Sequence, residues 1–203
     1  MSYGALLGQL DEWFVQGVAE AGPDVVLCRQ GCSQCCHGPF DISAADAELL
    51  VTAVARLDPA IRESVQQRAV SQHSQQAALL PEWQSPWDAE AVDEIRFDEM
   101  CDALSALPCA ALDAAGSCMV YDSRPATCRM IGLPLGSLAG EVIENACPII
   151  DTSASYAALG PVTFDIATFE RKSETAEIDA MSRGWVPTTI AAALARALLQ
   201  EMP

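Results

Sequence analysis

The chain has little positive charge: a single lysine, Lys172, and ten arginines stand against 28 acidic residues. The formal net charge is −17, before any thiolate is counted. Such a surface repels phosphate backbones, so we expect no nucleic-acid partner. A well-solvated acidic surface explains the charge, and docking to a basic protein partner is the alternative explanation.

Long apolar runs and targeting signals are also missing. No run of about 18 or more apolar residues occurs, so we expect neither a membrane span nor a membrane partner. The first residues, Met1 to Ala5, lack the basic and apolar regions of a signal peptide. We therefore expect a cytoplasmic protein. In that reducing compartment, clustered cysteines indicate metal ligands or redox groups before structural disulfides.

Signals of nucleotide binding and acid–base catalysis are absent as well. The chain has no glycine-rich cofactor loop and no His, Asp and Ser constellation. It has two histidines. His37 follows Cys36 directly, so it is a candidate for an extra ligand or for a donor beside the ligands. His73 falls on the polar face of a Gln-rich helical pattern, and we expect it to be exposed.

Apolar residues recur at helical spacing through most of the chain, which indicates a mainly α fold. We expect one domain over residues 1–203, large enough to bury a core without disulfides. A capping residue begins two helices, Ser43 in one and Asp58 before Pro59 in the other. The predicted helices run from about Leu6 to Gly22, from Ser43 to Leu57, from Pro59 to Leu80, from Ala89 to Leu107, from Tyr156 to Leu159, from Thr163 to Arg183 and from Thr188 to Met202.

Between the helices, short segments favour β structure. The residues from Cys109 to Tyr121, with a turn at Asp113 to Gly116, predict a small β-hairpin. Pro125 is well placed to open a short helix, and Val142–Ile143 predicts a short strand. We therefore predict an irregular helical domain with a small β-hairpin, organised around a cysteine-ligated metal centre. Its metal-binding core would span residues 28–150, and C-terminal helices would follow over residues 151–203.

Cysteine is the residue type that carries the chemical signal. Eight of nine cysteines fall into two groups at spacings typical of zinc or iron–sulfur ligation. The first group has four members within nine residues, and the second is spread over a longer segment. The members are Cys28, Cys32, Cys35 and Cys36 in the first group, and Cys109, Cys118, Cys128 and Cys147 in the second.

The number of thiols bears on the kind of centre. A mononuclear tetrahedral site takes four ligands, so eight thiols indicate a polynuclear centre or paired sites. Adjacent side chains tend to point apart, so Cys35 and Cys36 more naturally serve different metal atoms. Cys101 stands alone within a helical pattern, and we expect it to be an ordinary buried thiol. Zinc and iron both accept four thiolates, which leaves the metal open.

Arginines lie beside the cysteines. Arg29 follows Cys28, Arg129 follows Cys128, and Arg124 precedes Cys128 by one helical turn. Guanidinium N–H groups can donate charge-assisted hydrogen bonds to clustered thiolates and raise a cluster's reduction potential. The alternative is that these arginines form ordinary surface ion pairs in an acidic protein.

These motifs resemble the YkgJ-like CxxCxxCC cysteine-cluster family, which includes the flagellin lysine N-methylase. The match rests on Cys28-x3-Cys32-x2-Cys35-Cys36 and on the string Cys118-x2-Tyr121-x2-Arg124-Pro125-x2-Cys128-Arg129. The resemblance implies a zinc- or iron-chelating domain, in which the eight clustered cysteines are ligands. It places Tyr121, Arg124 and Arg129 around them, and the methylase suggests an iron–sulfur cluster.

Three functions are compatible with these signals. The leading one is a metal- or cluster-binding protein whose activity is unassigned. The second is a cluster-dependent enzyme that modifies proteins, such as a lysine N-methyltransferase. The third is a thiol redox sensor that uses Cys32, Cys35 and Cys36. The spacing from Cys28 to Cys35 also fits a radical S-adenosylmethionine enzyme, but the missing alternation of strands and helices argues against that fold.

Overall fold

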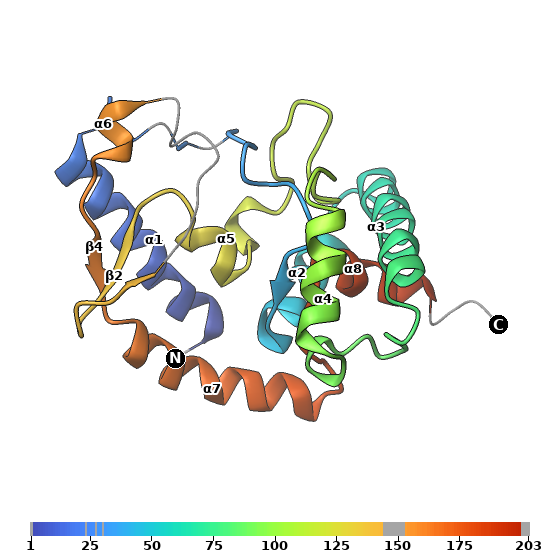
Figure 1. The fold of residues 1–203 in the computed structure, drawn as a ribbon. Coiled ribbons are helices and arrows are strands. Elements are labelled where there is room, and N and C mark those ends of the chain that lie inside the picture. Colours follow the sequence, from blue (N-terminus) through green and yellow to red (C-terminus); the bar gives the residue numbers. More distant parts are fainter. Residues whose placement is uncertain (1, 23, 27, 30, 144–152, 200–203) are drawn as a thin grey trace.

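The computed structural model describes residues 2–22, 24–26, 28–29, 31–143 and 153–199 (Figure 1). Within these ranges the chain forms eight α-helices and five short strands, so the prediction of a mainly α fold is confirmed. The helices are α1 (Tyr3–Ala21), α2 (Ala44–Ala55), α3 (Pro59–Leu79), α4 (Glu94–Ala103), α5 (Ala126–Met130), α6 (Ala154–Ala157), α7 (Ile166–Ser182) and α8 (Ile190–Leu199). The strands are β1 (Asp41–Ile42), β2 (Leu135–Ser137), β3 (Val142–Ile143), β4 (Val162–Phe164) and β5 (Thr188–Thr189).

The starts of the long helices follow from local capping. The Ser43 hydroxyl accepts a hydrogen bond of 3.1 Å from the backbone N–H of Asp46 and begins α2. The Asp58 carboxylate accepts from the N–H of Ala60 at 2.9 Å, and Pro59 occupies the first turn of α3. Each cap satisfies a backbone donor that has no partner within the helix. The predicted starts of both helices are confirmed.

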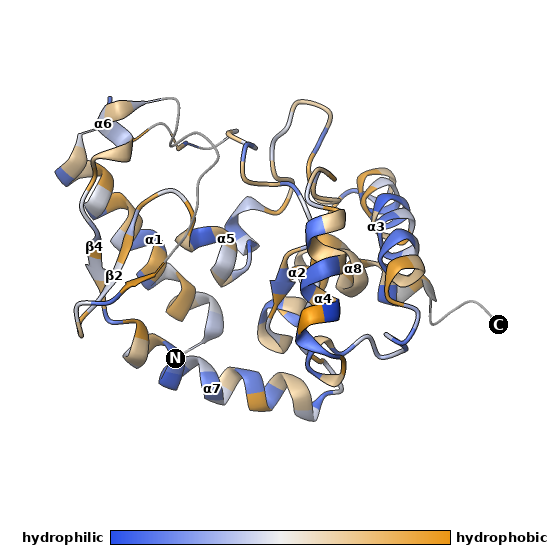
Figure 2. Ribbon diagram, in the orientation of Figure 1, coloured by the Kyte–Doolittle hydropathy of each residue, from blue (hydrophilic) through white to orange (hydrophobic). Residues whose placement is uncertain are grey.

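The helices lie in two groups with α5 between them (Figure 1). On one side α1 packs beside the sheet formed by β2, β3 and β4, and on the other side α2, α3, α4 and α8 lie together. α7 runs along the base and contacts both α1 and α2. α8 is mostly apolar (Figure 2), its residues 190–195 are all buried, and it packs along α3. Among the described helices, none is long and apolar enough to cross a membrane.

Two small sheets connect distant segments. β1 pairs antiparallel with β5, with Asp41 opposite Thr189 and Ile42 opposite Thr188. This pairing joins the segment just before α2 to the segment just before α8. In the other sheet β2 is central: it pairs antiparallel with β3, which confirms a strand at Val142–Ile143, and parallel with β4.

The predicted hairpin from Cys109 to Tyr121 is reduced to a single bridge between Leu112 and Cys118. The turn itself is present, because the Asp113 carboxylate accepts from the N–H groups of Ala115 and Ser117 at 2.8 Å. Arg68 on α3 donates to the carbonyl oxygens of Ala110 and Leu112. The carbonyl of Ala111 between them accepts from the N–H of Met119 at 3.0 Å, and no further bridge extends this pairing in the described residues. The antiparallel hairpin in this fold is formed by β2 and β3.

The predicted helix from Ala89 to Leu107 is shorter than expected. A 3₁₀ turn covers Ala89–Ala91, and α4 begins only after Asp93, whose side chain caps it. The extended backbone of Val92 separates the two segments. Two aspartate caps, Asp88 and Asp93, therefore divide a pattern whose apolar spacing alone suggested one continuous helix.

The expectation of an exposed His73 is wrong. Its exposed fraction is 4%, and its ring packs edge-on against Trp83 and Trp87 with centroid distances of 5.7 and 4.6 Å. Burial lowers the pKa of His73. Neighbouring Gln76 is also buried, and its amide oxygen accepts from the Thr189 hydroxyl at 2.9 Å. The part of α3 that carries His73 and Gln76 thus faces Trp83, Trp87 and β5, while Gln67 and Gln75 remain exposed.

Candidate metal centre

The first cysteine group lies on the loop between α1 and α2. Two consecutive turns shape it: the N–H of Cys32 donates to the carbonyl of Arg29 at 2.9 Å, and that of Cys36 to the carbonyl of Ser33 at 3.0 Å. These turns curl the loop so that all four cysteines of the group line the same cavity. The loop is otherwise irregular.

The second group is attached to the first through the backbone. The N–H of Cys109 donates to the carbonyl of Cys36 at 2.8 Å, and that of Gly38 to the carbonyl of Leu107 at 2.6 Å. Nearby, Gly116 has a φ of +81°, and a Cβ there would lie 2.9 Å from the hydroxyl oxygen of Ser33. Glycine is thus required where the turn of the second segment meets the first loop. The fold brings the two groups together, as a polynuclear centre with ligands from both groups requires.

One cavity of about 90 Å³ lies between the two groups. A single water molecule needs about 10–15 Å³ by the same measure, so the cavity has room for more than one ion. Phe14, Phe40, Leu50 and Ile190 contribute apolar wall. The cavity is lined by all seven clustered cysteines that the structure describes: Cys28, Cys32, Cys35, Cys36, Cys109, Cys118 and Cys128.

The remaining predicted residues are placed as follows. Cys147 lies outside the described residues. Cys101 does not line the cavity, and burial raises the pKa of its thiol to about 12. His37 is exposed and also does not line the cavity, but it forms a backbone bridge with Pro108. The cavity wall also includes Arg29, Tyr121, Arg124 and Arg129.

The cysteines share a cavity but do not form a finished coordination sphere. Among the described residues, no three His, Cys, Asp or Glu side chains converge closely enough to hold a metal ion as they stand. A cysteine sulfur changes position by rotation about one side-chain torsion, and the seven described cysteines line one cavity. Thiolates are the donors that zinc and iron–sulfur clusters take, and the donor set therefore fits either metal.

Burial favours the neutral form of three of these thiols, those of Cys109, Cys118 and Cys128. It raises the pKa of Cys109 to about 11 and that of Cys128 further, and Cys109 and Cys118 add like charge near Cys128. Cys35 is the exception, since a hydrogen bond from the Cys36 thiol lowers its pKa to about 7. Because thiolates are the ligands, a bound metal must displace protons from these sulfurs.

Cys28 is held against α1. Gly132 has a φ of +119°, and a Cβ there would lie 3.1 Å from the Cys28 sulfur and 3.0 Å from the Phe14 ring. Only glycine combines this backbone conformation with such close approach. The segment after α5 thus packs directly on the first cysteine of the loop.

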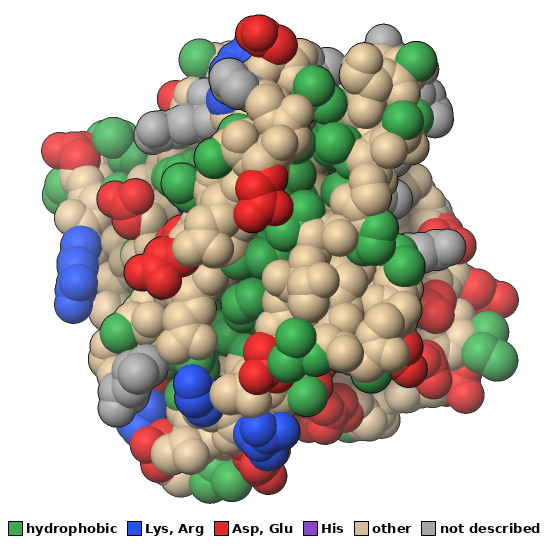
Figure 3. All heavy atoms as spheres, turned by 90° about the vertical axis from the view of Figure 1, so that its left-hand side faces the viewer, with side chains coloured by type: hydrophobic (Ala, Val, Ile, Leu, Met, Phe, Trp, Pro, Cys, Tyr) green, Lys and Arg blue, Asp and Glu red, His purple; other side chains and the backbone are tan. Residues whose placement is uncertain are grey.

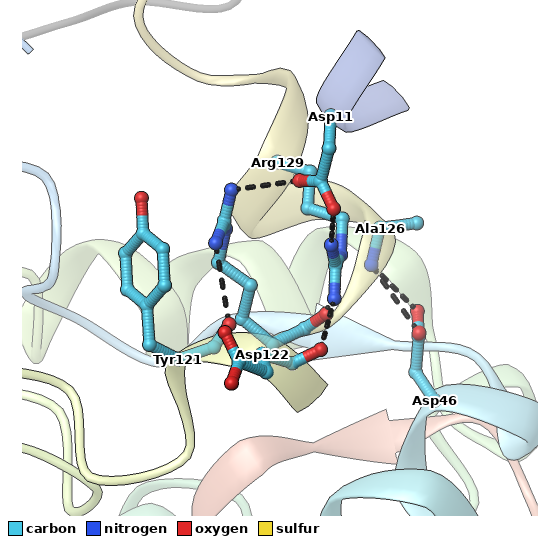
Figure 4. Close-up of polar contacts among 7 residues, drawn as sticks. Asp11, Asp46, Tyr121, Asp122, Ala126 and Arg129 are labelled. Atoms are coloured by element: carbon cyan, nitrogen blue, oxygen red, sulfur yellow. Dashed lines mark hydrogen bonds and ion pairs between the residues drawn. The ribbon is translucent and has the colours of Figure 1, made fainter. Parts of the chain in front are cut away.

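Two of the predicted arginines meet at Asp11 on α1 (Figure 4). Arg124 forms an ion pair of 2.9 Å with one carboxylate oxygen of Asp11, and Arg129 pairs with the other oxygen. Arg129 also donates to the carbonyls of Arg124 and Asp122, at 2.9 and 2.7 Å. These N–H groups donate to oxygens, where the sequence suggested thiolates. Arg124 and Arg129 thus form ion pairs, but the Arg129 side chain is 3% exposed and does not lie at the surface as the alternative expected.

A second carboxylate supports the helix that carries Cys128. The N–H of Ala126, the first residue of α5, donates to both oxygens of Asp46 at 3.2 Å, and the Tyr3 hydroxyl donates to the same carboxylate at 2.9 Å. Sequence reasoning missed Asp11, Asp46 and Arg68. Nothing in the sequence around Asp46 indicates its contact with Ala126, which lies 80 residues away in the chain.

Asp46 leads to a prediction about pH. Burial, together with the charge of Glu177, raises its pKa from an ordinary 3.8 to about 6. Its contribution to stability is therefore complete below about pH 4 and is lost as the pH rises through about 6. Asp46→Asn removes the ionisation, so between about pH 4 and pH 8 we expect its free energy of unfolding to gain about 3 kcal/mol relative to wild type. Urea unfolding at both pH values measures this, and an unchanged difference would contradict it.

A further hollow lies away from the cysteines. α1 and residues 159–163 border an open groove of about 480 Å³, which includes Trp13, Gly17 and Val162. Figure 3 shows this side of the molecule, where acidic side chains outnumber basic ones. Glu20 is the one charged residue among those that line the groove in the described chain. Without a sulfur or nitrogen ligand in its wall, the groove lacks the donor chemistry of the cysteine cavity.

Comparison with known proteins agrees with the cysteine pattern. Residues 27–148 match the CxxCxxCC family, described as a proposed zinc- or iron-chelating domain. The match covers more than half of the chain and includes all eight clustered cysteines. No curated protein and no solved structure matches the chain.

Proposed function

Because this chain belongs to the CxxCxxCC family of proposed zinc- or iron-chelating domains, we propose that it binds one polynuclear metal centre shared by its two cysteine groups. The observation that carries the proposal is the single cavity lined by seven cysteines from both groups. A mononuclear site would use four of them and leave three thiols without a role.

A shared centre fits this arrangement better than paired sites. In paired sites each cysteine group would surround its own ion, apart from the other group. Here Cys36 and Cys109 are joined through the backbone, and the charge of Cys35 acts on Cys128 in the other group. Sulfurs from both groups thus face common space, which is the arrangement that a cluster of several metal atoms requires.

The protein's contribution is to hold and shield the centre. The cysteines supply thiolate ligands, while Phe14, Phe40 and Leu50 limit access of water from the core side. A zinc centre would supply structural cross-linking, and an iron–sulfur centre would also supply electron transfer. The apolar wall and nearby charges set the reduction potential in the second case.

Metal analysis of protein purified without oxygen tests the proposal. We expect more than one metal atom per chain, with acid-labile sulfide and a visible absorption band if the metal is iron. Stably folded protein that contains no metal after growth with iron and zinc would overturn the proposal.

Single cysteine variants then separate one centre from two. Cys32→Ser and Cys118→Ser alter different groups, and Cys101→Ser is the matched control outside the cavity. A shared centre predicts that either cavity variant loses the same metal content and the same spectral features, while the control keeps both. If Cys32→Ser and Cys118→Ser each remove a different half of the metal, the centre is a pair of separate sites.

A further inference from the structure

Asp11 lies at the junction between α1 and the segment that carries Cys128. Its carboxylate stands between two guanidinium groups, Arg124 on one oxygen and Arg129 on the other (Figure 4). We propose that Asp11 is a positioning residue of the metal centre, which fixes α5 and Cys128 relative to the first cysteine loop. The inference rests on the proposed function, since it concerns how that centre is held.

The first step in the argument is the burial of Arg129. Its side chain is 3% exposed, and it bonds to Asp11 and to the carbonyls of Arg124 and Asp122. The two carbonyls belong to the turn that leads into α5. One guanidinium therefore connects this turn rigidly to α1, because its N–H donors lie in one plane and fix the positions of their acceptors.

The second step is the position of Arg124. Its guanidinium carbon lies 3.9 Å from the centre of the Tyr121 ring, and its other nitrogen donates to the Tyr121 carbonyl at 3.2 Å. The cation is thus held between the ring and Asp11. Both Tyr121 and Arg124 line the cavity, so the contact to Asp11 also fixes part of its wall.

The third step is the relation of α1 to the first cysteine group. α1 leads into the loop that carries Cys28, and Phe14 on α1 lines the cavity. Asp11 and Phe14 are three residues apart, which places them on the same face of the helix. The same face of α1 therefore contributes to the wall of the cavity and binds the turn before Cys128.

The charges explain why a carboxylate is required. Arg124 and Arg129 bring two positive charges together, and Asp11 is the acidic side chain that pairs with both within the described residues. In Asp11→Asn the amide oxygen can accept from one guanidinium, but the amide nitrogen then faces the other. The variant loses one bond and leaves two like charges side by side.

The experiment measures metal retention by the protein as purified. Wild type, Asp11→Asn and Asp11→Glu are mixed with excess EDTA, and metal release is followed over time. We expect Asp11→Asn to release metal about 10-fold faster or more, as for other groups that support metal ligands. Asp11→Glu keeps the charge and should lie between the two. Exposed Glu12 on the same helix gives the matched control, Glu12→Gln, which should behave as wild type.

Two further measurements distinguish positioning from general loss of stability. Phe97→Leu weakens a core cluster that does not line the cysteine cavity, and it should leave the release rate unchanged at a similar unfolding midpoint. In chelator-treated protein, Cys128 should be alkylated faster in Asp11→Asn than in wild type, with Cys101 as the internal reference. Equal release from Asp11→Asn and Phe97→Leu, or unchanged alkylation of Cys128, would overturn the inference. A metal-free wild type would instead overturn the proposed function, while the alkylation result would still test the role of Asp11.

Discussion

Removal of the metal should lower the free energy of unfolding by about 4 kcal/mol, the stabilisation that a ligand gives at about a thousand times its dissociation constant. The physical reason is that six of the seven described clustered cysteines lie outside helices and strands, with Cys128 on the short helix α5, and that the two groups are joined by backbone hydrogen bonds such as Cys109 to Cys36. A centre bound by both groups links these segments only in the folded state. Urea unfolding of protein as purified and after chelation, followed by circular dichroism, measures the difference.

Removal of the metal should first loosen the segments that carry the cysteines. The side chains Leu7, Leu10 and Val65 are buried in clusters built by the long helices, so most of the helical signal should persist after chelation. Cys101→Ser should respond to chelation as wild type does. An unchanged unfolding midpoint after complete removal of the metal would show that the centre does not hold the two segments together.

Arg129→Met should lower the free energy of unfolding by about 2 kcal/mol, since removal of the buried Arg129 guanidinium leaves its acceptors without a donor, although its partner Asp11 is 41% exposed. The carbonyls of Arg124 and Asp122 would lose their donor, and Asp11 would lose one of its two cations. Arg129→Lys keeps the charge, but a single ammonium cannot reach all three acceptors, so we expect about half of the loss. Urea unfolding of the metal-loaded variants gives these values.

Arg96 provides the matched control for this change. It also forms ion pairs, with Glu82 and Glu99, but its side chain is 47% exposed. Exposed pairs contribute about 0–1 kcal/mol, so Arg96→Met should have a small effect. If Arg129→Met and Arg96→Met cost the same, the buried network around Asp11 does not contribute as its geometry indicates.

The parts of the fold that the sequence predicts well are those with local causes. Ser43 and Asp58 cap their helices through hydrogen bonds to residues two or three positions away. Pro125 precedes α5 as expected. His73 could not be placed in this way, since its burial depends on Trp83 and Trp87 folding back over α3. A polar face predicts exposure only until another element covers it.

The candidate site likewise has features that the sequence predicts and features that depend on distant contacts. Cysteine spacing is a local property, and it identified the seven described cysteines that line the cavity. The partners of Arg124 and Arg129 could not be identified from spacing, because Asp11 is more than 100 residues away in the chain. Asp46 could not be identified either, because its contact with Ala126 depends on the packing of α2 against the α5 segment.

The pairing of β1 with β5 bears on where this protein could be divided. The segment by which the family is recognised covers residues 27–148 and excludes α1, β5 and α8. Yet α1 supplies Asp11 and Phe14, and α8 supplies Ile190 to the cavity wall and packs along α3. A gene fragment cut at the family's borders would encode the ligands without the walls that hold them. We therefore expect the smallest unit that folds on its own to be larger than residues 27–148, and a gene fragment made for expression should keep both flanks.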